Sequence, residues 1–577
     1  MNSELLDAIS IDRILEDTRY IAEETAWRIA GSEMERKAAN YIARQMREAG
    51  ATVELYEIDA YISFPHGATV EVLSPEHRII KANAFAQAAP TPAEGIEAEI
   101  VHVCAGGLDH YRGLDVAGKI TLSELSYSPP RPEKVRIAQA KGSIGQIMMN
   151  WGLPEHGTVP MGTCKPVWGN PTPENADRMP RIPAVGISLA DGKWLAKLAR
   201  NGPVKVRIHC NTENRWGKIV IPVAEIRGSV EPEKFVLVAG HYDAWAEGAT
   251  DNATGNAQMI ETARVLAANR EKLRRSVRFA FWSGHETGIM EGSSWFVDHF
   301  WDDLTENCVC TFNIDSTGML DTTHHQARSA PEMAGFLADI YREMLDEEVN
   351  VIDLHRTGDQ SFFGAGIPSL TQRTQHSPEL QKEWRGATLG WWYHSELDTM
   401  DKVDAEKLLL TARLTFGTIW KVLTQPALPL EHSRVVAKIE ARLAELGQVD
   451  IGIDFASLSA LAARLSGLTR ILEAKRDAIV AAGDAAALKE VNALMMRLSR
   501  ILTPITNTVA GRWTQDTYGL SSLATILPGL FEVRDLVELE PGSDQFKLQW
   551  TETLRQRNRA RDGIQTAIRE IDAWLGA

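Results

Sequence analysis

Residues 235–256 read FVLVAGHYDAWAEGATDNATGN, an apolar run that leads directly into a His-x-Asp pair and a second aspartate. The run predicts a short buried strand over Phe235–Ala239. Apolar residues then recur at helical spacing at Met259, Ile260, Ala263 and Leu266. A buried strand followed by an amphipathic helix is typical of a mostly parallel sheet that is covered on both faces. In such sheets, functional groups collect at the carboxyl ends of the strands.

The same arrangement recurs along the chain. Residues 277–288 (VRFAFWSGHETG) and 308–316 (CVCTFNIDS) each predict a strand, over Val277–Trp282 and Val309–Ile314, and each strand ends in polar residues. A fourth polar stretch, WWYHSELDT, follows at residues 391–399. The side chains singled out are His241, Asp243, Asp251, His285, Glu286, Asp315, His394 and Asp398.

These residue types indicate a metal site. A single aspartate after a strand is usually a turn former or a helix cap. Four successive elements that end in His, Asp or Glu within one region are less easily explained in that way. Imidazole nitrogen and carboxylate oxygen are ligands of zinc and of similar divalent metals. Bound cations would also relieve the mutual repulsion of carboxylates at the mouth of a buried sheet.

Composition changes along the chain predict its organisation. Residues 1–60 predict helices and a strand at Thr52–Tyr56, with Ser32 and Glu35 at capping-box spacing before a helix that ends at Gly50. Residues 61–218 predict short strands and long loops, whereas residues 219–425 alternate strands and helices. From residue 426 the chain is helical in pattern, as at Val435–Leu446 and Leu458–Ala474.

Length and charge limit the possible classes. A chain of 577 residues is expected to form two to four domains. Its net charge of -16 disfavours nucleic acid and anionic membrane surfaces as partners. We expect no secretory signal at the N-terminus and no transmembrane helix. The five scattered cysteines favour a reducing compartment, so we expect a cytoplasmic protein.

The motifs resemble those of a known family. His-x-Asp, Asp-Asn-x-x-Gly, Phe-Ala-x-Trp, Glu-x-Gly, Asn-x-Asp-Ser and Tyr-His-Ser occur in the order found in the zinc aminopeptidases that include glutamate carboxypeptidase II and the transferrin receptor. Residues 61–218 resemble the protease-associated insert of that family through GKITL, KVRIAQAKGSIGQIMMNW and RIPAVGIS. Residues 430–577 resemble its helical dimerisation domain through DFASLSALAARL and LATILPGLFEV.

The resemblance implies an α/β fold. The catalytic core, residues 1–60 and 219–425, would hold a mostly parallel sheet with helices on both faces. Residues 61–218 would form the inserted β-rich protease-associated domain, and residues 426–577 a helical domain through which the chain forms a homodimer.

The resemblance also implies a two-metal site, with zinc as the expected metal and manganese or cobalt as alternatives. His241 and Asp315 would bind one ion, Glu286 and His394 the other, and Asp251 both. Asp243 would accept the second ring N–H of His241. Two cations bridged by a carboxylate activate water near neutral pH, so we expect hydrolysis of a peptide or related amide C–N bond.

One position departs from the family pattern. Counted forward from Phe279, the position of the catalytic glutamate holds His285, and Glu286 takes the position of a ligand; counted back from Gly292-Ser293, Glu286 would be the base. We prefer the forward count, which keeps Glu-x-Gly. His285 would then be a general base, an extra ligand or a sign of different chemistry. A non-catalytic scaffold homologue and an acyl transferase or cyclase remain alternatives to the hydrolase.

Other residues near these motifs have two interpretations each. Tyr393 could donate a hydrogen bond to an oxyanion, or it could be a stacked structural tyrosine. Asp359 could lie at the site or form a turn. Side chains that could line a substrate pocket, rather than face solvent or the core, are Arg356, Arg373, His376, Arg385, Trp391, Trp392 and the segment Thr517-Tyr518-Gly519.

Overall fold

The computed structural model describes residues 3–354, 356, 358–449, 452–518 and 526–576, with Glu532 and Arg534 described by their backbone alone. Gly519 and residues 523–525, which the motif comparison singled out, lie outside this description.

One continuous sheet of 13 strands passes through the described residues, in the order β1-β2-β6-β5-β4-β3-β7-β9-β8-β10-β13-β11-β12. Its strands are β1 (Thr52–Ser74), β2 (Arg78–Ala84), β3 (Ile96–His102), β4 (Ile120–Glu124), β5 (Gly145–Met149), β6 (Ala184–Ile187), β7 (Lys205–Ile226), β8 (Glu231–His241), β9 (Arg275–Trp282), β10 (Cys308–Asn313), β11 (His324–Ser329), β12 (Val351–Asp353) and β13 (Ser369–Gln375).

The core half of the sheet is mostly parallel, because β9, β8, β10 and β13 run in one direction. Successive residues of β8 point to opposite faces of the sheet, and both faces are buried, which explains the unbroken apolar run. Val236 and Val238 pack into one hydrophobic cluster, and Phe235, Leu237 and Ala239 pack into another on the opposite face. Both faces are therefore buried, and the predicted α/β class is confirmed.

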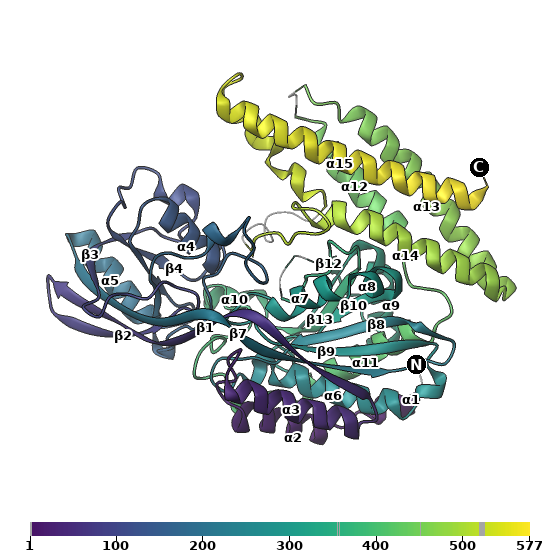
Figure 1. Cartoon of the computed structure of the whole chain (residues 1–577), viewed down its shortest axis with the longest axis horizontal. Helices are drawn as coiled ribbons and strands as arrows, with labels where there is room; N and C mark the ends of the chain where they lie inside the picture. Colours follow the sequence, from purple (N-terminus) through teal and green to yellow (C-terminus); the bar gives the residue numbers. More distant parts are fainter. Residues whose placement is uncertain (1–2, 355, 357, 450–451, 519–525, 577) are drawn as a thin grey trace.

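Helices cover both faces of this core (Figure 1). On one face lie α2 (Ile11–Arg19), α3 (Glu33–Glu48), α6 (Thr254–Ala267) and α11 (Ala405–Thr424); on the other lie α7 (Glu291–His299) and α8 (Trp301–Asn307). The remaining α-helices of the first 425 residues are α1 (Ser3–Asp7), α4 (Arg131–Ala140), α5 (Leu189–Asn201), α9 (Ala334–Leu345) and α10 (Pro378–Glu383).

The N-terminus of α3 forms only one of the two hydrogen bonds of the predicted capping box. The Ser32 hydroxyl accepts the N–H of Glu35 at 3.1 Å, as a helix cap should. The Glu35 carboxylate does not return to the cap. It accepts the N–H of Val220 at 3.0 Å and so fastens α3 to β7.

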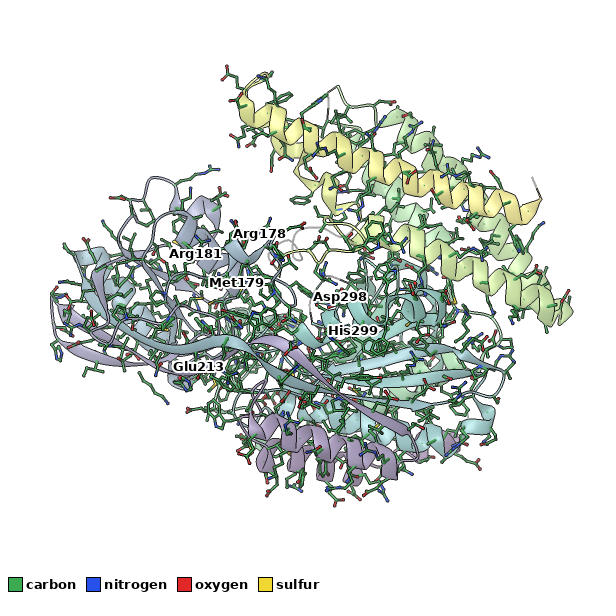
Figure 2. All side chains as sticks on the ribbon, in the orientation of Figure 1. Arg178, Met179, Arg181, Glu213, Asp298 and His299 are labelled. Atoms are coloured by element: carbon green, nitrogen blue, oxygen red, sulfur yellow. The ribbon has the colours of Figure 1, made fainter. Side chains whose placement is uncertain are left out.

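Strands β1 and β7 form a long antiparallel ribbon between the core and residues 61–218 (Figure 1). The strand expected at Thr52–Tyr56 is the first part of β1. Glu213 of β7, labelled in Figure 2, pairs with Phe64 of β1 on this ribbon. Both strands run through the expected boundaries near residues 60 and 218, and the division into domains stays a prediction.

The C-terminal part contains four long helices: α12 (His432–Leu446), α13 (Ala456–Ala482), α14 (Ala485–Asn507) and α15 (Asp544–Leu575). The buried Arg500 of α14 fastens them to the core, because its guanidinium donates to the carbonyls of Thr305 and Gly366 at 2.9 and 2.8 Å. In the part of the chain described, no helix combines the length and apolar character that a membrane span requires.

Candidate metal centre

The order of the core strands explains where the predicted side chains meet. Strands β9, β8 and β10 are neighbours and parallel, so their carboxyl ends lie at one edge of the sheet. His241 is the last residue of β8, Glu286 lies in the turn after β9, and Asp315 follows β10. The structure brings these three side chains together with Asp251 and His394, although the five come from positions up to 153 residues apart (394 minus 241).

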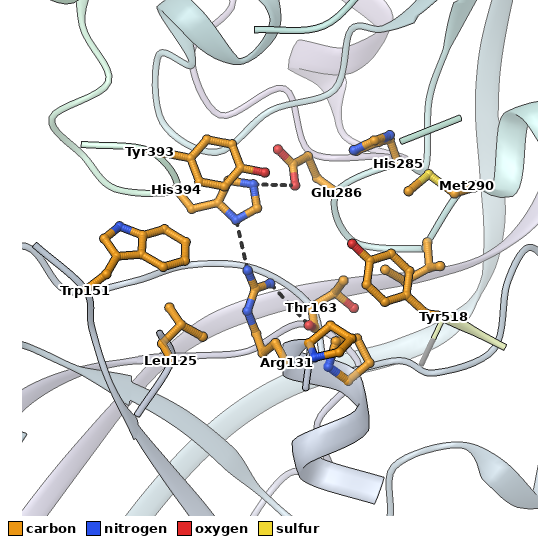
Figure 3. Close-up of a pocket in the computed structure, with 13 residues that line it drawn as sticks. Leu125, Arg131, Trp151, Thr163, His285, Glu286, Met290, Tyr393, His394 and Tyr518 are labelled. Carbon is orange, nitrogen blue, oxygen red and sulfur yellow. Dashed lines mark hydrogen bonds and ion pairs between the residues drawn. The ribbon is translucent and has the colours of Figure 1, made fainter. Parts of the chain in front are cut away.

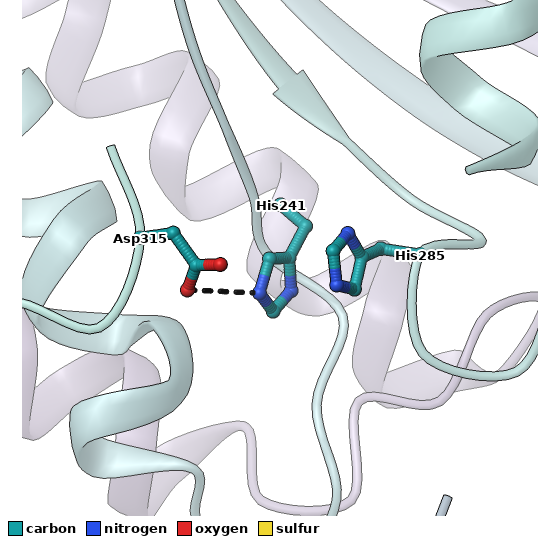
Figure 4. Close-up of side chains that lie close together, drawn as sticks. All are labelled: His241, His285 and Asp315. Atoms are coloured by element: carbon teal, nitrogen blue, oxygen red, sulfur yellow. Dashed lines mark ion pairs between the residues drawn. The ribbon is translucent and has the colours of Figure 1, made fainter. Parts of the chain in front are cut away.

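Asp251 lies between two pairs of side chains. Its Oδ1 is 3.1 Å from Nε2 of His241, and its Oδ2 is 3.3 Å from Nε2 of His394. Beyond His241, Asp315 Oδ1 lies 3.6 Å from the same Nε2 (Figure 4). Beyond His394, Glu286 Oε2 lies 3.1 Å from that ring (Figure 3). One carboxylate therefore connects two His–carboxylate pairs.

The loop that carries Asp251 is held by a second aspartate. The Asp398 carboxylate accepts the backbone N–H groups of Thr250 and Asp251, each at 3.0 Å, and the Thr250 hydroxyl at 2.7 Å. Burial raises the pKa of Asp398 to about 7. Asp398 was recognised in its motif, but its contacts show what it does: it fixes the position of Asp251.

The charges of the centre fit divalent cations. Burial opposes protonation of His241 and His394, yet the facing carboxylates outweigh it and raise the pKa of both rings. Burial also opposes ionisation of Asp251, but hydrogen bonds with both histidines lower its pKa well below the ordinary value. Glu286 Oε1 is buried with no hydrogen-bond partner among the described residues. Carboxylate oxygens and imidazole nitrogens gathered in this way are suited to bind zinc and similar metals.

Asp243 is placed differently from the expectation. Nδ1 of His241 lies 3.0 Å from the backbone carbonyl of Asp243 and 3.9 Å from its carboxylate. The carbonyl therefore orients the ring. The carboxylate instead accepts the N–H groups of His285 and Glu286 at 3.3 and 3.0 Å and shapes the turn after β9. Burial raises the pKa of Asp243 to about 6.

His285 lies face to face with His241, with ring centroids 3.8 Å apart and planes 11° apart (Figure 4). Its Nδ1 is 3.0 Å from Oδ2 of the buried Asp359. His241, His285 and Asp315 each offer one ligand atom within 4.8 Å of the others. His285, which the forward count predicts at the position of the family's glutamate, thus places an imidazole against the predicted ligands.

Comparisons with known proteins agree with this geometry. Residues 222–419 match peptidase family M28. The chain is 26% identical over 427 residues to aminopeptidase YwaD of Bacillus subtilis (strain 168), covering 71% of this chain and 84% of the relative. It is 23% identical over 492 residues to the probable glutamate carboxypeptidase VP8 of Zea mays, covering 72% and 68%. Residues 222–419 thus show the similarity to M28 peptidases that the motifs predicted.

A solved structure supports the fold. The zinc aminopeptidase of Bacillus subtilis aligns with a TM-score of 0.56 at 21% identity, covering 73% of this chain and 97% of the other. The family match and the relatives confirm the resemblance recognised from the motifs. The chain is a metal-dependent peptide hydrolase, and its predicted use of a divalent metal is supported.

A cavity of about 220 Å³ opens beside the candidate metal centre (Figure 3). Arg131, at the start of α4 in the 61–218 part, reaches into it. Its Nη2 lies 3.2 Å from Nδ1 of His394, and its Nη1 donates to the carbonyl of Thr163 at 3.2 Å. The remaining lining residues are mostly aromatic or apolar: Leu125, Pro130, Pro132, Trp151, Ile289, Met290, Tyr393 and Tyr518, together with Thr163, His285, Glu286 and His394.

Tyr393 lies flat on His394, with ring centroids 3.9 Å apart, and it also lines this cavity. Burial and the nearby carboxylates raise the pKa of Tyr393 well above its ordinary value, so the hydroxyl keeps its proton and can donate. Both interpretations of Tyr393 made from the sequence are compatible with this placement.

Several residues flagged in the sequence lie outside the cavity lining. Arg373 donates to the carbonyl of Asp315 at 3.0 Å, and Arg385 pairs with Glu124 at 2.6 Å. Arg356 is buried over Trp168. His376 bonds to the carbonyls of Leu320 and Thr388. Tyr518, in contrast, does reach the cavity.

Two contributors were missed by sequence reasoning. Trp245 donates its Nε1 hydrogen to Oε2 of Glu286 at 2.9 Å. Arg131 lies 263 residues from His394 in the chain. Trp245 stands between two flagged motifs and could have been suspected. Nothing in the local sequence around Arg131 indicates a role at the site, because only the fold brings residues 61–218 to the candidate metal centre.

Proposed function

We propose that this chain hydrolyses an amide C–N bond in a peptide or a small N-acyl amide with two divalent cations, zinc first and manganese or cobalt as alternatives. The observation that carries the proposal is Asp251, whose two oxygens face two separate histidines at 3.1 and 3.3 Å. His241 and Asp315 would hold one ion, Glu286 and His394 the other, and Asp251 both. Bound cations supply polarisation of the scissile carbonyl and a lowered pKa for water.

Residues of the chain itself would transfer the protons of the hydrolysis. Nδ1 of His285 contacts Asp359, which leaves Nε2 as the nitrogen that can accept a proton from the attacking water. The nitrogen would then return this proton to the leaving amine. Tyr393 keeps its hydroxyl hydrogen and would donate it to the oxygen that becomes negative as the carbonyl is attacked.

The cavity indicates the kind of substrate. The Arg131 guanidinium rests against His394, and its buried Nε has no hydrogen-bond partner among the described residues. A guanidinium in this position can bind a carboxylate of the substrate beside the scissile bond. Trp151, Tyr393 and Leu125 offer apolar surface to the rest of the molecule. We therefore propose a small amide that carries an anionic group.

Two alternatives are less well supported. An acyl transferase or cyclase would need a site without room for water, whereas a cavity of about 220 Å³ has ample room. A scaffold protein would have no reason to keep a buried set of carboxylates and imidazoles in which Glu286 Oε1 has no hydrogen-bond partner among the described residues.

Amine release from a defined panel tests the proposal. The panel contains aminoacyl p-nitroanilides, free dipeptides and N-acetyl dipeptides that end in Glu, Leu or Lys. Zinc- or manganese-loaded protein is compared with chelated protein and with Glu286→Ala. Hydrolysis that disappears in both comparisons is expected. Turnover that persists without metal would contradict the proposal.

Two arginines of helix α4 provide a test of the proposed substrate preference and its control. Arg131→Ala should raise KM for the N-acetyl dipeptides by about 10- to 100-fold, since a hydrogen bond to a charged group contributes about 1.5–3 kcal/mol. Arg136 lies on the same helix and pairs with Glu133 at the surface. Arg136→Ala should leave KM unchanged. Equal effects of the two changes would remove Arg131 from the substrate site.

We also propose a homodimer through the C-terminal helices and a cytoplasmic location. Ile471 and Val480 of α13 and Leu548 of α15 are 48%, 44% and 73% exposed, which is costly for apolar side chains unless a partner covers them. All five cysteines are free, as a reducing compartment favours. Light scattering of the purified chain would report its mass in solution, and a monomer at micromolar concentration would contradict the dimer.

A further inference from the structure

Asp359 is a buried carboxylate that forms hydrogen bonds with the side chains of His285 and Ser293. Its Oδ2 lies 3.0 Å from Nδ1 of His285, and its Oδ1 accepts the hydroxyl of Ser293 at 3.0 Å. It is only 3% exposed. An aspartate that shapes a turn accepts backbone N–H groups. Among the described residues, no backbone N–H donates to this carboxylate.

A chain of donors holds the carboxylate in place. Trp168 donates its Nε1 hydrogen to Ser361 Oγ at 2.8 Å, and Ser361 Oγ lies 2.9 Å from Ser293 Oγ. An indole N–H can only donate, and an ionised carboxylate can only accept. Ser293 donates to Asp359, and Ser361, which also lies 3.2 Å from Ser294 Oγ, can donate to Ser293. With Oδ1 occupied by Ser293, Oδ2 is the oxygen that accepts from His285.

This arrangement determines which nitrogen of His285 carries the hydrogen. A neutral imidazole has one N–H and one lone pair, and the carboxylate selects the tautomer with the hydrogen on Nδ1. The lone pair then lies on Nε2. His285 stacks on His241 and offers one ring nitrogen within 4.8 Å of the ligand atoms of His241 and Asp315, so the ring lies at the candidate metal centre.

We propose that Asp359, supported by Ser293 and Ser361, is a positioning residue that fixes the ring and the tautomer of His285, so that Nε2 is free to handle the proton of the hydrolysis. The inference rests on the proposed function. It depends on the histidine, because a glutamate at position 285 would have no N–H for Asp359 to bind. Asp359 would thus support the histidine that we predict at the position of the family's glutamate.

Asp359→Asn provides the test. With its amide oxygen toward the Ser293 hydroxyl, the asparagine turns its NH2 toward Nδ1, which favours the tautomer with the hydrogen on Nε2. On the best substrate of the panel, kcat should fall by about 100-fold or more, as losses of such orienting carboxylates do. KM and the zinc content should stay unchanged. Loss of zinc would overturn the proposal, because His285 would then be holding the metal.

A matched control separates this effect from a simple loss of a buried charge. Asp17 is also buried, 8% exposed, and accepts the Tyr41 hydroxyl at 2.6 Å, without contact to His285 or to the predicted ligands among its hydrogen bonds. Asp17→Asn should leave kcat unchanged. A loss of kcat as large as that of Asp359→Asn would overturn the proposal.

A second measurement does not depend on turnover. Long-range ¹H–¹⁵N spectra of zinc-loaded protein labelled with ¹⁵N-histidine report the tautomer of each ring, and His285→Gln assigns the signal. The expected wild-type state has the hydrogen on Nδ1, and Asp359→Asn should shift it to Nε2. The same tautomer in both proteins would overturn the proposal, even if no substrate were found and the hydrolase assignment failed.

A double-mutant cycle checks that Asp359 acts through His285. In a His285→Ala background, Asp359→Asn should change the residual kcat by less than about 3-fold, because its partner is already absent. A full additional loss in this background would show that Asp359 acts by another route and would overturn the proposal.

Discussion

Lys165 and Glu291 form an ion pair next to the metal centre, and both side chains are 0% exposed. Their N–O distance is 2.9 Å, and Lys165 also donates to the carbonyl of Gly288 at 2.6 Å. The pair therefore supports the turn that carries Glu286. Burial raises the pKa of Glu291 to about 7, so the carboxyl depends on the lysine for its ionisation.

Lys165→Met should lower the free energy of unfolding by about 3–5 kcal/mol at pH 8, since it leaves Glu291 buried without a partner. Lys165→Met combined with Glu291→Gln should recover much of this loss, because no charge then remains to be buried. Urea denaturation of the three proteins checks the prediction. A Lys165→Met protein as stable as the wild type would show that the ion pair contributes little to the free energy of unfolding.

Glu35 gives the stability of the core a pH dependence. Burial raises its pKa from 4.5 to about 7 despite hydrogen bonds that favour ionisation. Between these values the folded chain keeps a proton that the unfolded chain has lost, so stability falls as pH rises. Glu35→Gln removes this titration. From pH 4 to pH 8 its stability relative to the wild type should rise by about 3 kcal/mol. Denaturation midpoints measured at several pH values would show no such trend if Glu35 were ionised throughout.

At the scale of elements, the short-range patterns predicted the positions of the core strands β8, β9 and β10. The run Phe235–Ala239 lies within β8, and Val277–Trp282 forms most of β9. The full length of β1 could not be predicted, because its second half depends on pairing with β7 more than 130 residues later in the chain. The partner of Glu35 could not be predicted either, because Val220 comes from a distant strand.

The joint between α12 and α14 contains a histidine that should make the C-terminal helices sensitive to acid. Burial, together with the charge of Arg476, lowers the pKa of His432 from 6.5 to about 3. Its Nε2 lies 3.0 Å from the Ser499 hydroxyl. The stability that depends on the neutral ring is complete above pH 6.5 and is lost as pH falls toward 3.

His432→Gln removes this titration while keeping a polar group for Ser499. Between pH 7 and pH 5 the wild type should lose about 2 kcal/mol relative to the variant. Helical circular dichroism during urea denaturation at the two pH values measures the difference. Parallel losses in both proteins would mean that another group controls the acid sensitivity.

At the scale of the whole molecule, the metal centre combines predictable and unpredictable parts. His241, Glu286 and Asp315 could be predicted because each follows a strand, and parallel strands end at one edge. Arg131 could not, because it reaches the centre only through the position of residues 61–218 relative to the core. The interaction of Asp359 with His285 was equally hidden, since 74 residues separate them.

Metal stoichiometry tests the proposed two-metal site most directly. Purified chain is saturated with zinc, desalted and measured by inductively coupled plasma mass spectrometry beside Asp251→Ala and the control Asp17→Asn. We expect two zinc ions per chain in the wild type and in the control. We expect one or none in Asp251→Ala, because that carboxylate would serve both ions. A wild type that retains one ion or none, or an Asp251→Ala variant that retains two, would contradict the two-metal site.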